Sequence, residues 1–237
     1  MPNPYFSFKQ FTIRQDQCAM KVCTDACIFG AWFAAKIPQY GSVLDIGSGT
    51  GLLMMMLAQR SQAEIQGIEI DQAAFNQLKE NISSNQWKDR LKAFSGDIRT
   101  YSFPSKYDFI ISNPPFFEND IASAADNEQV AKHSKHLKLE ELIRAVDTNL
   151  EDGGGFGILL PWHRWEYFDT LAAKQGFFLT EKLFVKQTPR HNYFRAILYY
   201  SRSHENFVPT FELTIQQENG SYSSEFTELL KDYYLYL

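Results

Sequence analysis

The segment Asn113-Pro114-Pro115-Phe116 holds the residues best suited to chemistry in this chain of 237 residues. It directly follows the run 107–112, which has the apolar composition of a buried strand. The side-chain oxygen of Asn113 and the carbonyl between the prolines can both accept hydrogen bonds from one NH2 group, because proline fixes φ and restricts the residue before it. Phe116 adds a flat apolar face. The segment therefore predicts a site for the planar amine of a flat substrate.

A second segment, Asp45-Ile46-Gly47-Ser48-Gly49-Thr50-Gly51, closes one predicted strand and opens the next predicted helix. Glycines at such a turn let the backbone approach a ligand closely. A dinucleotide-binding loop would place its third glycine at position 52, where this chain has leucine. The shifted Gly51 and the acidic Asp45 indicate a nucleotide cofactor with an amino-acid end rather than a pyrophosphate.

Two more acids lie at or just after the ends of the next two predicted strands. Glu69 lies in the strand predicted over 64–70, where a carboxylate can accept hydrogen bonds from both hydroxyls of an adenosine ribose. Asp97 follows the strand predicted near 91–94 and is placed to meet an adenine amino group. Asp71 is better placed to cap the next helix. Any one acid could be a solvated surface group, but their order along alternating strands and helices predicts one cofactor site.

These motifs together resemble the class I S-adenosylmethionine-dependent methyltransferases, over roughly residues 42–160. The resemblance implies S-adenosylmethionine as the cofactor, with Glu69 at its ribose and Asp97 at its adenine. The expected cofactor contacts are Lys21, Thr24, Asp45, Gly47, Gly49, Gly51, Glu69, Asp97 and Asn113. Methyl transfer from a sulfonium needs alignment of the acceptor more than a strong base. Hydrogen bonds to Asn113 and the Pro114 carbonyl favour the pyramidal, charge-developing amine, so Asn113, Pro114, Pro115 and Phe116 form the predicted catalytic segment and no general base is assigned.

The first third of the chain narrows the resemblance. The segments 8–13, 18–22 and 30–32, with the glycine loop and 113–117, closely resemble the bacterial tRNA1(Val) (adenine-37 N6)-methyltransferases across nearly the full length. That family implies methylation of the exocyclic N6 of adenine 37, beside the anticodon of a valine-accepting tRNA. The base must leave its stack to react, and Phe116 or Phe117 can supply a stacking face. Relatives often have tyrosine at the position of Phe116, so a ring hydroxyl is missing here.

Basic side chains outside this segment could contact RNA phosphates. One cluster comprises Lys132, His133, Lys135, His136 and Lys138, and another comprises Lys186, Arg190 and Arg195. The early segment with Lys9 and Lys21 could fold over the cofactor and present a basic edge to the RNA. The expected substrate contacts are therefore Phe117, Lys9, Lys132, Arg190 and Arg195. A solvated surface explains such charges equally well.

The motif leaves two other functions open. Asn-Pro-Pro-aromatic also occurs in enzymes that methylate the glutamine amide of release factors, so a protein glutamine N5-methyltransferase is the main alternative. Those enzymes usually carry a helical N-terminal domain, whereas only about 40 residues precede the glycine loop here. The other alternative is a catalytically silent RNA-binding module, which the intact Asp45, Glu69 and Asn113 argue against.

Alternating strand and helix patterns predict an α/β fold: a Rossmann-like class I methyltransferase core, with a mostly parallel seven-stranded sheet and helices on both faces. We expect one domain over 1–237, with an N-terminal extension and cap helix in 1–40 and the core in 41–237. At the level of single elements, we expect Thr24 and Asp25 to cap the first helix, Gly153-Gly154-Gly155 to turn a helix into the strand 156–160, and 162–175 to form one helix. The segment 211–216 is a possible final strand. We also expect 118–134 to form a loop over the site and the tail 226–237 to pack on the body.

Composition sets the remaining bounds. The net charge of −5 argues against a uniformly basic nucleic-acid surface but allows a local one. Cys18, Cys23 and Cys27 leave one thiol unpaired in any disulfide scheme and lack the spacing of an iron–sulfur site, which favours a reducing cytosol. No secretory leader or run of transmembrane length is recognisable. We therefore expect a cytoplasmic monomer that binds neither membrane nor metal.

Overall fold

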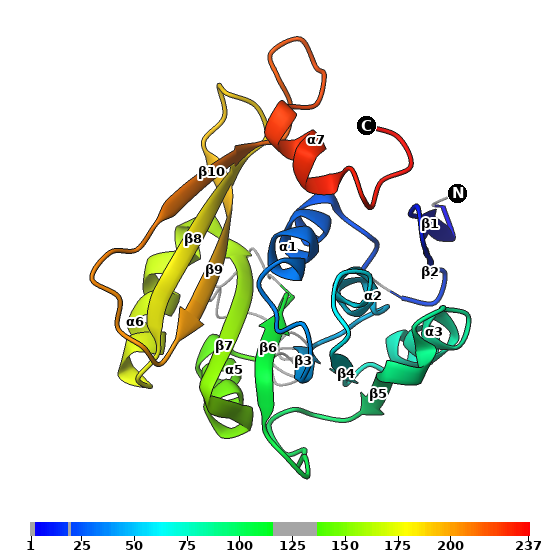
Figure 1. Ribbon diagram of the computed structural model, residues 1–237, viewed down its shortest axis with the longest axis vertical. Helices are drawn as coiled ribbons and strands as arrows, with labels where there is room; N and C mark the ends of the chain where they lie inside the picture. Colours follow the sequence, from blue (N-terminus) through cyan, green and yellow to red (C-terminus); the bar gives the residue numbers. More distant parts are fainter. Residues whose placement is uncertain (1–2, 19, 116–136) are drawn as a thin grey trace, which may run out of the picture.

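The computed structural model describes residues 3–18, 20–115 and 137–237 (Figure 1). Its centre is an eight-stranded sheet with the strand order β10-β8-β9-β7-β6-β3-β4-β5. These strands are β3 (Ser42–Ile46), β4 (Glu64–Glu69), β5 (Leu91–Ser95), β6 (Tyr107–Ser112), β7 (Leu150–Pro161), β8 (Phe178–Lys186), β9 (Tyr193–Ser201) and β10 (Thr210–Thr214). A separate antiparallel pair is formed by β1 (Tyr5–Ser7) and β2 (Thr12–Arg14).

The predicted class of sheet is confirmed, but its strand count was wrong. Only β9 runs antiparallel to its neighbours, β7 and β8, while the other adjoining strands of the sheet are parallel. The eighth strand is β10, which pairs Leu213 with Val185 of β8. It forms because Leu213 and Ile215 bury their side chains in the same core cluster as β8. The segment noted as a possible final strand thus extends the sheet at its edge.

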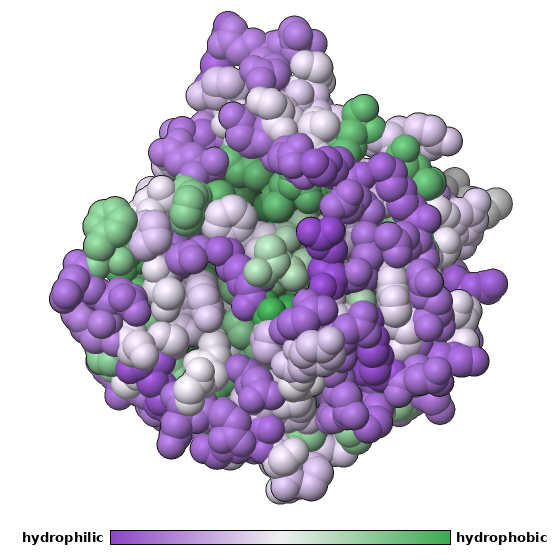
Figure 2. All heavy atoms as spheres, viewed as in Figure 1, coloured by the Kyte–Doolittle hydropathy of each residue, from purple (hydrophilic) through white to green (hydrophobic). Residues whose placement is uncertain are grey.

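Helices cover both faces of the sheet, as predicted. Successive side chains on a strand point to opposite faces. Val43 accordingly joins the apolar cluster under α1 (Thr24–Ala34), α2 (Leu52–Ala58) and α7 (Ser224–Leu230), whereas Leu44 joins the cluster under α5 (Leu139–Asn149) and α6 (Trp165–Lys174). Figure 1 shows α1, α2 and α7 gathered on one side of the sheet, with α3 (Gln72–Ser83) beside β5. The face of the molecule that Figure 2 shows is mostly hydrophilic, with apolar atoms gathered mainly in the region of α1 and α7.

Three local expectations need correction. The N-cap of α1 is Cys23 rather than Thr24 or Asp25, and its side chain makes no capping hydrogen bond. The run Gly153–Gly155 lies inside β7, because a Cβ at Gly155 would approach Tyr199 and Phe109 to within 2.8 Å in this crowded central strand. The expected helix 162–175 is divided into the 3-10 turn η2 (Trp162–Arg164) and α6.

The C-terminal tail packs on the body, as predicted. Phe226, Leu230 and Tyr233 are buried in the core cluster that contains α1 and α2. Tyr234 forms an isolated antiparallel bridge with Phe8, beside the β1–β2 hairpin. The two ends of the chain therefore lie next to each other, as the N and C marks in Figure 1 show. Among the described residues, no helix combines the length and the apolar character that crossing a membrane would require.

Candidate active site

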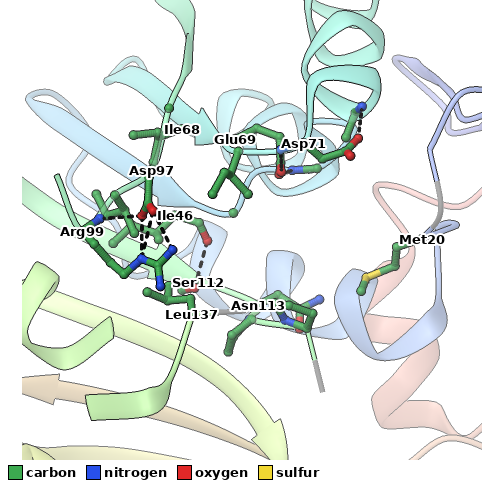
Figure 3. A pocket seen from close by; sticks show the side chains of 18 of the residues that line it. Met20, Ile46, Ile68, Glu69, Asp71, Asp97, Arg99, Ser112, Asn113 and Leu137 are labelled. Carbon is green, nitrogen blue, oxygen red and sulfur yellow. Dashed lines mark hydrogen bonds and ion pairs between the residues drawn. The ribbon is translucent and has the colours of Figure 1, made fainter. Parts of the chain in front are cut away.

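A cavity of about 240 Å³ lies at the carboxyl ends of β3, β4, β5 and β6 (Figure 3). The order in which strands are added to the sheet reverses there, since β4 and β5 lie on one side of β3 and β6 lies on the other. Such switch points bind ligands in open α/β sheets. The predicted site residues that line the cavity are Gly47, Gly49, Glu69, Asp97, Asn113, Pro114 and Pro115. Phe116, Phe117 and Lys132, together with the loop expected at 118–134, fall at positions outside the described residues.

The glycines of the loop 47–51 meet two different structural needs. Gly47, Gly49 and Gly51 all have positive φ, of 74°, 53° and 86°. A Cβ on Gly47 or Gly49 would meet no atom within 4 Å, so these residues border open space at the cavity. A Cβ on Gly51 would lie 2.5 Å from Cδ1 of Leu78 in α3. Gly47 and Gly49 therefore make room for a ligand, and Gly51 lets α3 pack closely.

The carboxylate of Glu69 is oriented by the backbone on both sides. Oε2 accepts a hydrogen bond from the Gly49 N–H at 2.8 Å, and Oε1 accepts one from the Asp71 N–H at 2.8 Å. Asp71 caps α3, as predicted, by accepting from the Ala74 N–H at 2.8 Å. A carboxylate has about four lone-pair sites, so both oxygens of Glu69 can still accept from a diol in the cavity.

Asp97 lies across the cavity from Asn113 in Figure 3 and is held by Arg99, a residue that the sequence reasoning missed. The guanidinium and the backbone N–H of Arg99 both donate to the Asp97 carboxylate. These hydrogen bonds lower the pKa of Asp97 from its ordinary value. The carboxylate therefore stays ionised and can accept from an adenine amine. Arg99 itself lines the cavity.

Asp45 is fully buried beneath the glycine loop and does not line the cavity. Among the described residues, neither of its carboxylate oxygens has a hydrogen-bond partner. Burial, with a smaller contribution from the charge of Glu69, raises the pKa of Asp45 to about 8. A buried carboxylate without a partner is costly unless a cation approaches it. This donor set fits S-adenosylmethionine, whose ammonium and sulfonium groups are cationic.

The early segment forms one wall of the cavity through Cys18 and Met20. Asn81 of α3 holds this segment: its amide accepts from the Arg14 N–H and donates to the Arg14 carbonyl, each at 2.9 Å. The same amide donates to the Thr50 carbonyl of the glycine loop at 2.9 Å. Asn81 thus links β2 to the cofactor loop, although a lone asparagine within a helical pattern gave no signal of this role.

Several expected contacts lie away from the cavity lining. Lys21 donates to the Gln15 carbonyl, and Thr24 is the first residue of α1. Lys9 donates to the Lys231 carbonyl at 2.5 Å, Arg190 forms two hydrogen bonds of 3.0 Å with Glu218, and Arg195 pairs with Asp25 at 2.6 Å. In the parts of the chain that the structure describes, no three His, Cys, Asp or Glu side chains gather as a metal site would require.

Comparisons with known proteins identify the family of this chain. The family model "Methyltransferase small domain" matches residues 30–160. A tRNA1(Val) (adenine(37)-N6)-methyltransferase from Dyadobacter fermentans is 42% identical over 98% of this chain and 98% of its own length. Another, from Bacteroides thetaiotaomicron, is 38% identical over 100% of both chains.

Solved structures show the same fold at low identity. The structure of a predicted O-methyltransferase from Agrobacterium tumefaciens superposes with a TM-score of 0.66 at 14% identity, covering 87% of this chain and 95% of that one. A putative RNA methyltransferase from Pyrococcus horikoshii gives 0.53 at 20% identity, over 76% of this chain and 83% of that one. The class I methyltransferase fold, the family match and the full-length relatives together show that this chain belongs to the methyltransferase small domain family and, within it, to the family of tRNA1(Val) (adenine(37)-N6)-methyltransferases.

Proposed function

We propose that this protein transfers a methyl group from S-adenosylmethionine to the exocyclic N6 of adenine 37 in a valine-accepting tRNA. One observation carries the proposal: Asn113, from the end of β6, borders the same cavity as Glu69 and Asp97, from the ends of β4 and β5 (Figure 3). The residues suited to the acceptor amine and those suited to the cofactor thus share one cavity. The identity of the substrate rests on the named relatives.

The cofactor is held at three points in this proposal. Glu69 accepts hydrogen bonds from the ribose hydroxyls, and Asp97 accepts one from the adenine amine. Gly47 and Gly49 leave space at the cavity for the cofactor. Asp45 lies buried under the loop, where its carboxyl group can release its proton to solvent and balance the cationic end of the cofactor as it binds. When bound, S-adenosylmethionine supplies a methyl group that is activated by its sulfonium sulfur.

Asn113 prepares the acceptor nitrogen. Its side-chain oxygen and the Pro114 carbonyl accept the two N–H groups of the adenine amine, which pulls electron density toward the nitrogen as positive charge develops there. The position of Asn113 is fixed by its neighbour Ser112, whose Oγ donates to the Ile46 carbonyl at 2.9 Å. This hydrogen bond joins the end of β6 to the end of β3, so the acceptor segment and the glycine loop keep a constant separation. The proton leaves after the transfer, and no general base is required.

The RNA must bring an unstacked adenine into the cavity. Lys9, Arg190 and Arg195 are proposed phosphate contacts, although each now binds an acceptor on the protein. A phosphate would have to replace those acceptors. Salt dependence of binding will report how many such exchanges occur, because each neutralised phosphate releases counterions.

The test supplies radiolabelled S-adenosylmethionine with total tRNA from cells lacking this modification, and separately with release factor. Label in tRNA that nuclease digestion assigns to N6-methyladenosine at position 37 of the valine acceptor supports the proposal. Label in protein, or at another nucleoside, contradicts it. The Asn113→Ala variant is the control for the active site, since it retains the fold of the strand but lacks the acceptor oxygen.

A further inference from the structure

Trp162 is an exposed aromatic residue just beyond the carboxyl end of β7, on the same side of the sheet as the active site. The residue is 37% exposed, although tryptophan is usually well covered. It directly follows β7, which pairs in parallel with β6, the strand that leads into Asn113 (Figure 1). The register pairs Ser112 with Ile158. Trp162 is four residues beyond Ile158, so it lies about 13 Å past that pair in the same direction as Asn113–Pro115.

The indole of Trp162 is supported from within the protein. Its ring lies 5.9 Å from that of Tyr193 with an interplanar angle of 32°, and it meets the ring of Phe184 edge-on at 6.4 Å. These contacts order the side chain before any partner binds, so binding loses little conformational entropy.

Tyr193 is itself held in place by Glu212 and Lys186. Its hydroxyl donates to Glu212, and Nζ of Lys186 lies 4.3 Å from its ring centroid. Lys186 also donates to Glu212 at 3.3 Å. The result is an aromatic pair whose inner member is fixed by an ion pair and whose outer member, Trp162, is partly open to solvent.

We propose that Trp162 stacks on a nucleobase of the RNA that neighbours the adenine entering the cavity. This inference rests on the proposed function, because it requires the acceptor to be a base in RNA. A base that leaves its stack deprives its neighbours of one stacking surface. An ordered indole one strand away from Asn113 replaces that surface without reading the sequence, since every base has a π-face. Trp162 thereby positions the strand while taking no part in methyl transfer.

The experiment uses the unmodified anticodon stem-loop of the valine tRNA as its probe. Binding of this RNA, binding of S-adenosylmethionine and kcat/KM are measured for wild type, Trp162→Ala and Trp162→Phe. The matched control is Tyr40→Ala, because Tyr40 is 74% exposed but precedes β3 at the opposite edge of the sheet. We expect Trp162→Ala to lose about 10-fold or more in RNA affinity, Trp162→Phe to recover most of it, and Tyr40→Ala to match wild type. Cofactor affinity should be unchanged in all variants.

A second arm removes the base instead of the side chain. Stem-loops with an abasic sugar immediately before or after the target adenine should bind wild type more weakly at one of the two positions, whereas Trp162→Ala should show no further loss at that position. Equal abasic penalties in wild type and Trp162→Ala overturn the inference. So does a parallel fall in cofactor affinity, which would show a structural role for the indole. RNA binding that depends on Trp162 without methyl transfer contradicts the proposed function alone. Methyl transfer with wild-type RNA affinity and wild-type kcat/KM in Trp162→Ala contradicts the inference alone.

Discussion

The guanidinium of Arg99 holds the Asp97 carboxylate in a fork. Nε lies 2.9 Å from both carboxylate oxygens, and Nη2 lies 2.6 Å from Oδ2 (Figure 3). Nη1 lies 3.6 Å from Oε2 of Glu141, which also accepts from the Lys138 N–H at the start of α5. Arg99 therefore connects the wall of the cavity formed by the end of β5 with the N-terminus of α5.

The Arg99→Gln substitution should weaken S-adenosylmethionine binding, and most strongly at acid pH. Arg99 lowers the pKa of Asp97, and only the ionised carboxylate accepts well from an adenine amine. Without Arg99 the pKa of Asp97 rises, so cofactor affinity should begin to fall at a higher pH as the solution is acidified. Calorimetric titration between about pH 3 and pH 7 measures this shift, because the ordinary pKa of an aspartate is about 3.9. Arg99→Lys keeps the charge and serves as the control. Identical acid limbs in wild type and Arg99→Gln would show that Arg99 does not tune this carboxylate.

The Asp45→Asn substitution should stabilise the cofactor-free protein and impair cofactor binding. The pKa of Asp45 is raised to about 8 by burial, so between about pH 4 and pH 8 the folded state binds a proton that the unfolded state lacks. The free energy of unfolding contributed by this group therefore falls as pH rises through that range. The wild-type melting temperature should drop relative to Asp45→Asn between about pH 5 and pH 8. Thermal melts with and without S-adenosylmethionine test both effects, and parallel pH profiles for the two proteins would contradict the expectation.

Asn113→Ala should lower kcat by about 100- to 1000-fold with saturating RNA and cofactor, because it removes one acceptor from the developing charge. The binding constants should change far less than kcat. Asn113→Asp keeps an acceptor oxygen at the same distance from the backbone and should retain more activity than Asn113→Ala. Single-turnover kinetics separates the chemical step from binding, and a variant Asn113→Ala with wild-type kcat would remove this residue from the mechanism.

Gly47→Ala and Gly51→Ala should fail in different ways. Both glycines have positive φ, so alanine costs about 1–2 kcal/mol of backbone strain at either position. A Cβ at Gly51 would also lie 2.5 Å from Leu78, whereas a Cβ at Gly47 enters open space. Gly51→Ala should therefore show the larger loss of stability in denaturant, and Gly47→Ala the larger loss of cofactor affinity relative to its loss of stability. The reverse ranking would mean that Gly47 does not border the bound cofactor.

The sequence predicted well those features that depend on the order of strands and helices. Glu69, Asp97 and Asn113 line one cavity because each lies at or just after the carboxyl end of a parallel strand, and these ends meet at one edge of the sheet. The fork of Arg99 could not be foreseen, because the reach of a long side chain leaves no periodic pattern. Asn81 was missed for a related reason: hydrophobic periodicity treats asparagine as a surface residue, yet it is 1% exposed and fully hydrogen-bonded.

The strand β7 shows the opposite kind of error. Three consecutive glycines normally indicate a turn, which is why Gly153–Gly155 were expected to form a turn between a helix and the strand 156–160. Here the crowded side chains of β6 and β9 require a strand without a Cβ at Gly155, and that requirement comes from neighbours remote in sequence. Tertiary packing therefore overrode the local signal.

The bridge between Phe8 and Tyr234 cannot form during synthesis until Tyr234 has been added to the chain. The Lys9 side chain and its acceptor, the Lys231 carbonyl, are 222 positions apart in the chain. The hairpin of β1 and β2 is therefore synthesised long before the C-terminal residues that it contacts. The adjoining residues Cys18 and Met20 form a wall of the cofactor cavity. A nascent chain that has completed the central sheet can thus form the Asn81 contacts of this segment but still lacks its contacts with Lys231 and Tyr234, and full cofactor affinity should be acquired only after α7 and the tail have docked.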